Sequence, residues 1–278
     1  SAQVTHTDRL VNISTRGATG DNDKLIIAGF VISGSAPKDV LIRAVGPGLT
    51  GLGVTGAMEN PVLTLYRGSQ IIFTNDDWGN STDASKLASE AARLGATPLA
   101  AGSKDAALFT TLNPGVYTAH ITRAPGSDNG VALIELYDAS VDAGAETQRL
   151  VNISSRGEVR TGEGILISGF VVTGNYPKKV LIRGVGPTLS SQGVTGVLEN
   201  PVLRIWKGST EIASNDDWST DGAVELDAAA MQVGAFTLNN PSKDAAILLT
   251  LAPGIYTAQV SGSGGTTGIA LVEVYEVP

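Results

Sequence analysis

The residues best suited to chemistry form a short acidic run that occurs twice in the chain. NDDW at residues 75–78 returns at residues 215–218. Asn and Asp supply the oxygen ligands that a hard cation such as calcium takes, and carbonyls of the following loop can complete its shell. The predicted calcium ligands are Asn75, Asp76, Asp77, Asp83, Asn215, Asp216, Asp217 and Asp221. The structural alternative is that these side chains close a turn by bonding to backbone amides.

The tryptophan that ends each run suggests a second kind of site. Exposed aromatic rings stack on sugar faces, so Trp78 and Trp218 are the candidate ligand-binding residues of a carbohydrate-binding module. Aromatic residues make up only 5% of the chain, however, and three of them are tryptophan. An aromatic ring in a β-sandwich usually belongs to the core. Polysaccharide binding is therefore the alternative hypothesis.

The sequence offers little for catalysis. Its two histidines are His6 and His120, and the second half has Glu146 and Gln259 at the matching positions. Carboxylates shared by both halves could act as acid and base, but nothing places two of them beside a cleft. No nucleotide-binding, nucleophile-elbow or zinc-protease motif occurs. We predict a protein without enzymatic activity and keep a hydrolase only as a third hypothesis.

Four charged residues lie inside apolar stretches. Arg43 and Arg183 interrupt VLIRAV and VLIRGV, and Glu135 and Glu273 interrupt the last apolar stretch of each half. A buried charge must be paired, because losing its hydration is costly. We expect these residues to form structural Arg–Glu or Arg–Asp bridges.

The NDDW run and the Arg and Glu residues recur because the chain is duplicated from Arg9 onward. RLVNISTRG at residues 9–17 returns as RLVNISSRG at residues 149–157, and the two halves align onward to their ends. A period of about 140 residues suits a complete small domain, not a solenoid unit. The expected organisation is an N-terminal arm (1–8), repeat 1 (9–137), a linker (138–148) and repeat 2 (149–278).

Hydrophobic spacing predicts an all-β fold. About eight short stretches rich in Val, Ile and Thr occur in each half, separated by Gly and Pro turns. One helical pattern, SKLASEAARL at residues 85–94, ends before a glycine. The strands expected in the first half are 10–14, 24–33, 39–45, 61–67, 70–74, 105–112, 115–122 and 130–137. We predict two tandem antiparallel, jelly-roll-like β-sandwich domains with one short helix in each.

Composition excludes several partners. The formal net charge is −8 and the 19 basic residues are dispersed, which argues against nucleic acid and anionic membranes. Without cysteine there is no disulfide framework and no thiolate metal site. No apolar run approaches the roughly 18 residues of a membrane helix, and no cleavable signal is present, so we expect a mature or trimmed N-terminus.

The later part of each half resembles a known family. The progression PVLTLYRG, FTNDDWG, TLNPGVYTAHI and GVALIELY is similar to the bacterial pre-peptidase C-terminal domain, and the second half repeats it as PVLRIWKG, ASNDDW, TLAPGIYTAQV and GIALVEVY. The front part lies outside that pattern, and the whole unit resembles a repeat of large bacterial secreted and surface proteins. The resemblance implies a secreted, non-catalytic accessory module, often calcium-tolerant, although no peptidase or hydrolase is attached here.

The leading functional hypothesis is thus an extracellular structural or interaction protein at the bacterial cell surface. It would associate with itself as a surface or fibre subunit, or with other surface proteins. Adhesion is part of this predicted role. The N-terminal arm could add a strand to the sheet edge of a neighbour. The alternative is a carbohydrate-binding accessory module of a secreted enzyme system.

Overall fold

The computed structural model describes the chain except for residues 1–9, 20–24, 141–147 and 221. The expected N-terminal arm lies outside the described residues. Repeat 1 contains the first eight strands, and these are β1 (Leu10–Ala18), β2 (Ile26–Gly34), β3 (Lys38–Val45), β4 (Pro61–Arg67), β5 (Gln70–Asn75), β6 (Ala106–Leu112), β7 (Gly115–Arg123) and β8 (Val131–Asp138). Repeat 2 contains β9 (Gln148–Val159), β10 (Leu166–Val172), β11 (Lys178–Val185), β12 (Pro201–Lys207), β13 (Thr210–Asn215), β14 (Ala245–Leu251), β15 (Gly254–Gly262) and β16 (Gly268–Val277).

The helices are few and short. The predicted helix is α2 (Ala84–Arg93), and its counterpart in repeat 2 is α3 (Ala223–Val233). α2 places Leu87 and Ala91 in the core, one turn apart on the same face. The remaining helical turns are α1 (Pro47–Thr50), η1 (Trp78–Asn80), η2 (Gly162–Gly164), η3 (Pro187–Gln192) and η4 (Ser263–Gly265). The sequence did not predict α1, which was expected to belong to a loop.

Each repeat has the strand order of a jelly roll. Repeat 1 forms the sheets β5-β4-β7-β2 and β1-β8-β3-β6, and repeat 2 forms β13-β12-β15-β10 and β9-β16-β11-β14. Every strand ladder is antiparallel. Eight strands in two facing sheets is the double-sheet jelly-roll architecture. The all-β antiparallel prediction is confirmed.

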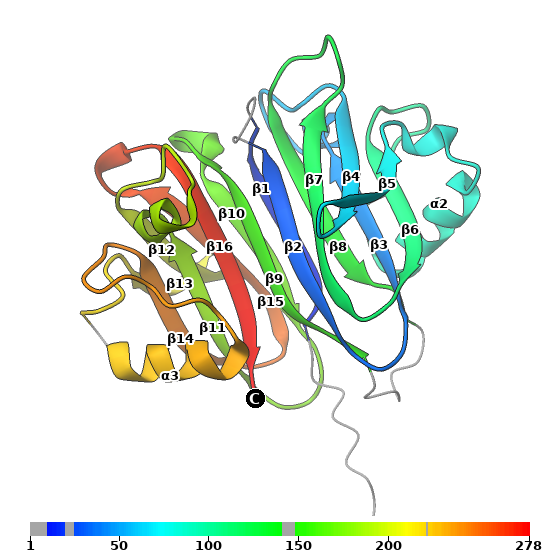
Figure 1. The fold of residues 1–278 in the computed structure, drawn as a ribbon. Coiled ribbons are helices and arrows are strands. Elements are labelled where there is room, and N and C mark those ends of the chain that lie inside the picture. Colours follow the sequence, from blue (N-terminus) through cyan, green and yellow to red (C-terminus); the bar gives the residue numbers. More distant parts are fainter. Residues whose placement is uncertain (1–9, 20–24, 141–147, 221) are drawn as a thin grey trace, which may run out of the picture.

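The two repeats also share both sheets, which the sequence did not predict. β1 of repeat 1 pairs with β10 of repeat 2, and β9 of repeat 2 pairs with β2 of repeat 1. We call these four strands the seam, and they lie in the middle of the molecule, between α2 on one side and α3 on the other (Figure 1). Each four-stranded sheet of one repeat therefore continues into a sheet of the other.

The two strand pairings of the seam are equivalent to each other under the duplication. Phe30 lies opposite Ile153 across one pairing, and Phe170 lies opposite Ile13 across the other. All four side chains are at most 3% exposed and belong to one core cluster that runs through both repeats. Burying one such side chain contributes about 1.5–3 kcal/mol, so the seam is held by the main hydrophobic core.

Small polar residues let the seam strands approach closely. The Thr15 hydroxyl, which is fully buried, lies 2.8 Å from Ser155 Oγ and 3.2 Å from Ser168 Oγ. A Cβ atom on Gly29 would lie 2.7 Å from the Ser154 hydroxyl. These three buried hydroxyls therefore satisfy one another, as buried polar groups generally must.

Because each repeat alone would expose the edges of β1 and β2, or of β9 and β10, we predict that the repeats bind each other when separated. Residues 1–140 and 147–278, expressed as two polypeptides in one cell, should purify together as a 1:1 complex, as judged by light scattering. Two stable, monomeric halves would show that the seam is dispensable.

Candidate functional site

The repeated acidic run lies at an outer corner of each repeat, where the two sheets of a sandwich meet. We define the corner of repeat 1 as residues 75–78 with residues 103–105, and that of repeat 2 as residues 215–218 with residues 242–244. Asn75, the last residue of β5, accepts a hydrogen bond from the backbone of Ala107 on β6 at 3.0 Å. Asn215 accepts the same bond from Ala246. Both asparagine side chains thus tie one sheet to the other through a long-range contact.

The aspartates that follow have different surroundings. Asp76 and Asp216 are exposed, whereas Asp77 and Asp217 are half-buried. Asn80 donates to Asp77 Oδ2 at 3.1 Å, but Oδ1 of Asp77 is buried without a hydrogen-bond partner, and so is Oδ1 of Asp217. A buried unpaired oxygen in both repeats is a feature that a bound cation would satisfy.

The wider ligand set is not assembled around these oxygens. Within the described residues, no group of three or more His, Cys, Asp or Glu side chains is close enough to hold a metal ion. Asp83 precedes α2 and is exposed, and Asp221 lies outside the described residues. Calcium binding at the two corners therefore stays a prediction that depends on Asp76, Asp77 and their counterparts.

The two tryptophans belong to the packing beneath the helices. The Trp218 side chain is 1% exposed, and its indole N–H donates to Asn239 O at 3.2 Å and to Ser242 Oγ at 3.1 Å. Trp78 is half-buried and makes the equivalent bonds to Ala100 and Ser103. A ring held inside the core cannot offer its face to a polysaccharide, so Trp218 does not suit the sugar-stacking role that was predicted for it.

The core of each corner is a buried aspartate whose role the sequence did not indicate. Asp105 is fully buried, and its Oδ1 accepts the backbone N–H groups of Gly46 at 2.8 Å and Gly48 at 3.2 Å. Its Oδ2 accepts the Ser103 hydroxyl at 2.7 Å. The aspartate and the Gly-Pro turn both recur in the second half, but they are almost sixty residues apart, so the sequence gives no signal that they touch.

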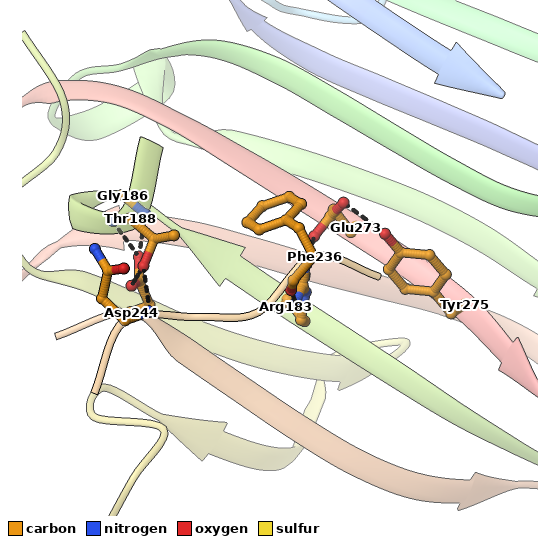
Figure 2. Close-up of polar contacts among 8 residues, drawn as sticks. Arg183, Gly186, Thr188, Phe236, Asp244, Glu273 and Tyr275 are labelled. Atoms are coloured by element: carbon orange, nitrogen blue, oxygen red, sulfur yellow. Dashed lines mark hydrogen bonds and ion pairs between the residues drawn. The ribbon is translucent and has the colours of Figure 1, made fainter. Parts of the chain in front are cut away.

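Asp244 makes the same arrangement in repeat 2. It accepts from the backbone of Gly186 at 2.8 Å and from the Thr188 hydroxyl (Figure 2). It also accepts from the Ser242 hydroxyl at 2.6 Å. Every oxygen of these two buried carboxylates is hydrogen-bonded, which is what allows a charge to remain in the core. Asp105 and Asp244 are therefore structural.

The buried arginines pair with the glutamates that the sequence named. Arg43 Nη2 lies 2.8 Å from Glu135 Oε2, and Arg183 Nη2 lies 2.5 Å from Glu273 Oε2 (Figure 2). Tyr137 donates its hydroxyl to Glu135 at 2.8 Å, and Tyr275 does so to Glu273 at 2.7 Å. Burial, followed by the neighbouring Glu135 carboxylate, raises the pKa of Tyr137. Each of the two arginines is thus paired with a buried glutamate in the core, as expected.

The outer edge strands are the other candidate surface. In the described part of the chain, β5 pairs only with β4 and β13 pairs only with β12. β5 exposes Ile71 (56%) and Phe73 (45%), whereas β13 carries Glu211 opposite Trp206 and 3.6 Å from Arg204. An apolar unpaired edge is a template for strand addition, and a charge on the edge opposes it. β13 also exposes Ile212 (40%), but β5 has the more apolar edge of the two because it carries two such side chains and no charge.

Comparisons with known proteins add no functional information. No family model matches the sequence, and no curated protein matches it. Among solved structures, this chain matches the crystal structure of a DUF4785 family protein from Legionella pneumophila at 7% sequence identity. The match covers 96% of this chain and 83% of that chain with a TM-score of 0.23. At that score the likeness carries no argument about fold or function. The described residues also include no helix long and apolar enough to cross a bilayer.

The Gly46 position gives a direct test of the corner. Its φ of −121° lies outside the left-handed region, but a Cβ there would lie 2.3 Å from the carbonyl oxygen of Met58. Gly46→Ala should therefore destabilise the protein by about 1–3 kcal/mol through overpacking. Gly51→Ala is the control, because its nearest atom is 3.7 Å away. Equal urea midpoints for the two variants would contradict this account.

His120 gives a test by pH. It is half-buried on β7, its ring lies 4.4 Å from that of Tyr66, and burial followed by the charge of Arg156 lowers its pKa below 6.5. The unfolded state then binds more protons than the folded state, so stability is present above about pH 6.5 and is lost as pH falls toward the folded pKa.

His120→Gln, which installs the residue that repeat 2 has at Gln259, should flatten the dependence of the urea midpoint on pH between about 7 and 5.5. The part of the slope that remains in this variant measures the other titrating groups. An unchanged slope would show that His120 does not contribute to the pH dependence of stability.

Proposed function

We propose that this protein is a non-catalytic structural subunit that associates with further copies of itself through the outer edges of its sheets. The observation that carries the proposal is the seam. There, two copies of the same module already join by strand pairing, and the apolar edge of β5 remains available beyond it. The extracellular, cell-surface setting is proposed from the family resemblance of the sequence.

The character of the four outer edges favours an open assembly. β5 and β14 are the outer strands of one continuous sheet, and β13 and β6 are the outer strands of the other. These edges differ in sequence, so pairing of one edge with an unlike edge of a neighbour has no two-fold axis that would close it. Such heterologous contacts propagate into filaments. A fibre or surface layer is accordingly the proposed assembly.

Calcium is proposed as a modulator of this contact. Asp76 and Asp77 follow β5 directly, so their negative charges lie at the end of the proposed contact strand. A cation bound there would neutralise that charge and satisfy the unpaired oxygen of Asp77. Measurements of assembly with millimolar calcium and with a chelator separate this proposal from the edge contact itself.

We predict that Ile71→Lys reduces self-association, because a lysine on an edge strand must be desolvated when another strand pairs with it. The control is Val116→Lys, which changes a 64% exposed residue on β7, a strand already paired on both sides. Light scattering over a range of concentrations should show assemblies for the native protein and the control and a mass near 28.5 kDa for Ile71→Lys. A monomeric native protein at every concentration, with and without calcium, would refute self-association.

A further inference from the structure

A groove of about 340 Å³ opens at the outer end of repeat 2, beside the unpaired edge of β14. The end of β13, the first turn of α3 and the start of β14 bound it, and its principal lining residues are Ser214, Asn215, Glu225, Leu226, Ile247 and Leu248. In the described part of the chain, β14 pairs only with β11. The groove therefore lies along a free strand, on the side of repeat 2 that is turned away from the seam (Figure 1).

The backbone of β14 is oriented to accept another strand in this groove. Alternate residues of an antiparallel strand point their N–H and C=O groups away from the partner strand. The Ala246 N–H points away from β11, because it donates to Asn215 Oδ1 at 3.0 Å. Leu248, two residues further along β14, therefore presents its backbone groups on the same side. A strand laid in the groove would satisfy them.

The corresponding position of repeat 1 is occupied by a cation–aromatic contact. Lys86 and Glu225 each precede the buried leucine of their helix. Phe109 and Leu248 lie at the same offset of 139 residues. The Lys86 ammonium lies over the Phe109 ring, 4.3 Å from its centroid. A glutamate and a leucine cannot form this contact, so the space beside β14 stays open in repeat 2.

The β5 edge carries apolar side chains that suit this groove. A bulge in its pairing with β4 places the exposed Ile71 and Phe73 on opposite faces of the strand. The groove offers apolar contacts on both faces of β14, since Ile247 belongs to the core between the sheets and Leu248 packs with α3. An apolar cavity of about 150 Å³ admits a benzene ring, so the larger groove has room for side chains of this size.

The strand directions allow copies to join in a single orientation. Within the described residues, the sheet β5-β4-β7-β2-β9-β16-β11-β14 is antiparallel at every pairing, so its two outer strands run in opposite directions. The sheet from β6 to β13 alternates in the same way. A second copy in the same orientation thus lays β5 antiparallel to β14 and β6 antiparallel to β13. Both sheets then continue, as they do across the seam.

Charge also favours contact between unlike ends. At the outer end of repeat 1, Lys86 belongs to α2, which covers the outer face of the sheet that ends in β6. Glu211 of β13 lies on the outer face of its sheet, because the neighbouring pair of Ile205 and Ala213 faces the core. Joining β6 to β13 therefore brings Lys86 toward the Glu211 carboxylate. Joining two like ends brings equal charges together, which is unfavourable.

We propose that the groove beside β14 receives the β5 edge of a second copy of the chain, so that β5 pairs with β14, β6 pairs with β13, and copies join head to tail. Ile71 and Phe73 of one copy are then buried against the groove of the next. This inference rests on the proposed self-association and names the two surfaces that meet.

Filling the groove tests the proposal. The double variant Glu225→Lys/Leu248→Phe gives repeat 2 the two side chains that occupy this position in repeat 1. It should weaken self-association about tenfold or more, because the apolar side chains of β5 lose the surface that buries them. The control is Ile255→Phe, which enlarges a 71% exposed residue on β15, a strand already paired on both sides. Light scattering over a range of concentrations measures both.

A mixture of two blocked variants identifies the surfaces that meet. Ile71→Lys has a blocked β5 edge and a native groove, whereas the double variant has a filled groove and a native β5 edge. At a concentration at which the native protein assembles, each variant alone should stay near 28.5 kDa. Their equimolar mixture should form a 1:1 dimer of twice that mass and nothing larger. No dimer in the mixture, or assembly of either variant alone, would overturn the inference.

The outcomes separate this inference from the proposed self-association. If the native protein and the double variant assemble equally well, the groove is not the contact, and association through other edges stands. If the native protein is monomeric at every concentration, both proposals are refuted.

An exchange of the end charges decides the question if the double variant does not fold, as judged by its urea midpoint. Lys86→Glu and Glu211→Lys should each weaken association about twofold to fivefold, because like charges then meet at the contact. A mixture of these two variants should assemble as the native protein does, since each repeat 1 end then meets a repeat 2 end of opposite charge. A mixture that assembles no better than the single variants would contradict the inference.

Discussion

Backbone pairing across the seam is the interaction on which the rest of the structure depends. β1 and β2 are the inner edge strands of repeat 1, and each finds its missing partner in repeat 2. Edge strands carry rows of N–H and C=O groups that must be satisfied by water or by another strand. Because both sheets are completed at once, one hydrophobic core extends through both repeats. The seam also sends the two corners and the two helices to opposite ends of the molecule, where they can differ from one another without disturbing the core.

The polar contacts of the corners, and the ion pairs beside them, show how a module keeps charged side chains inside a sandwich. A fully hydrogen-bonded aspartate fixes the Gly-Pro turn, an asparagine links the two sheets, and an arginine pairs with a glutamate under the helix. Each of these contacts is present in both repeats. Breaking one partner of such a buried pair leaves an uncompensated charge, which costs more than the pair itself contributes. The shared polar framework therefore contributes to the stability of both repeats.

Much of the local structure could be predicted from the sequence. Alternating apolar residues locate the strands, and the helical spacing of SKLASEAARL locates α2 within one residue at each end. Charges within apolar stretches anticipate the ion pairs of Arg43 and Arg183. The seam was not predictable in this way, because a strand has the same pattern whether its edge meets water or another repeat. Nor could the sequence predict that the buried Arg43 and Arg183 donate to the backbone carbonyls of Thr97 and Phe236, which occupy equivalent positions in the two repeats.

The seam has a further consequence for how the chain is made. The partner of β1 is β10 (Leu166–Val172) and the partner of β2 is β9 (Gln148–Val159), so repeat 1 cannot complete its sheets until the first two strands of repeat 2 have been synthesised. Contacts so distant in sequence form slowly. During translation the first repeat presents two open edges that a neighbouring nascent chain can fill equally well, because it carries the same strands. Exchange of repeats between chains on one polysome is the misassembly to which this architecture is most exposed.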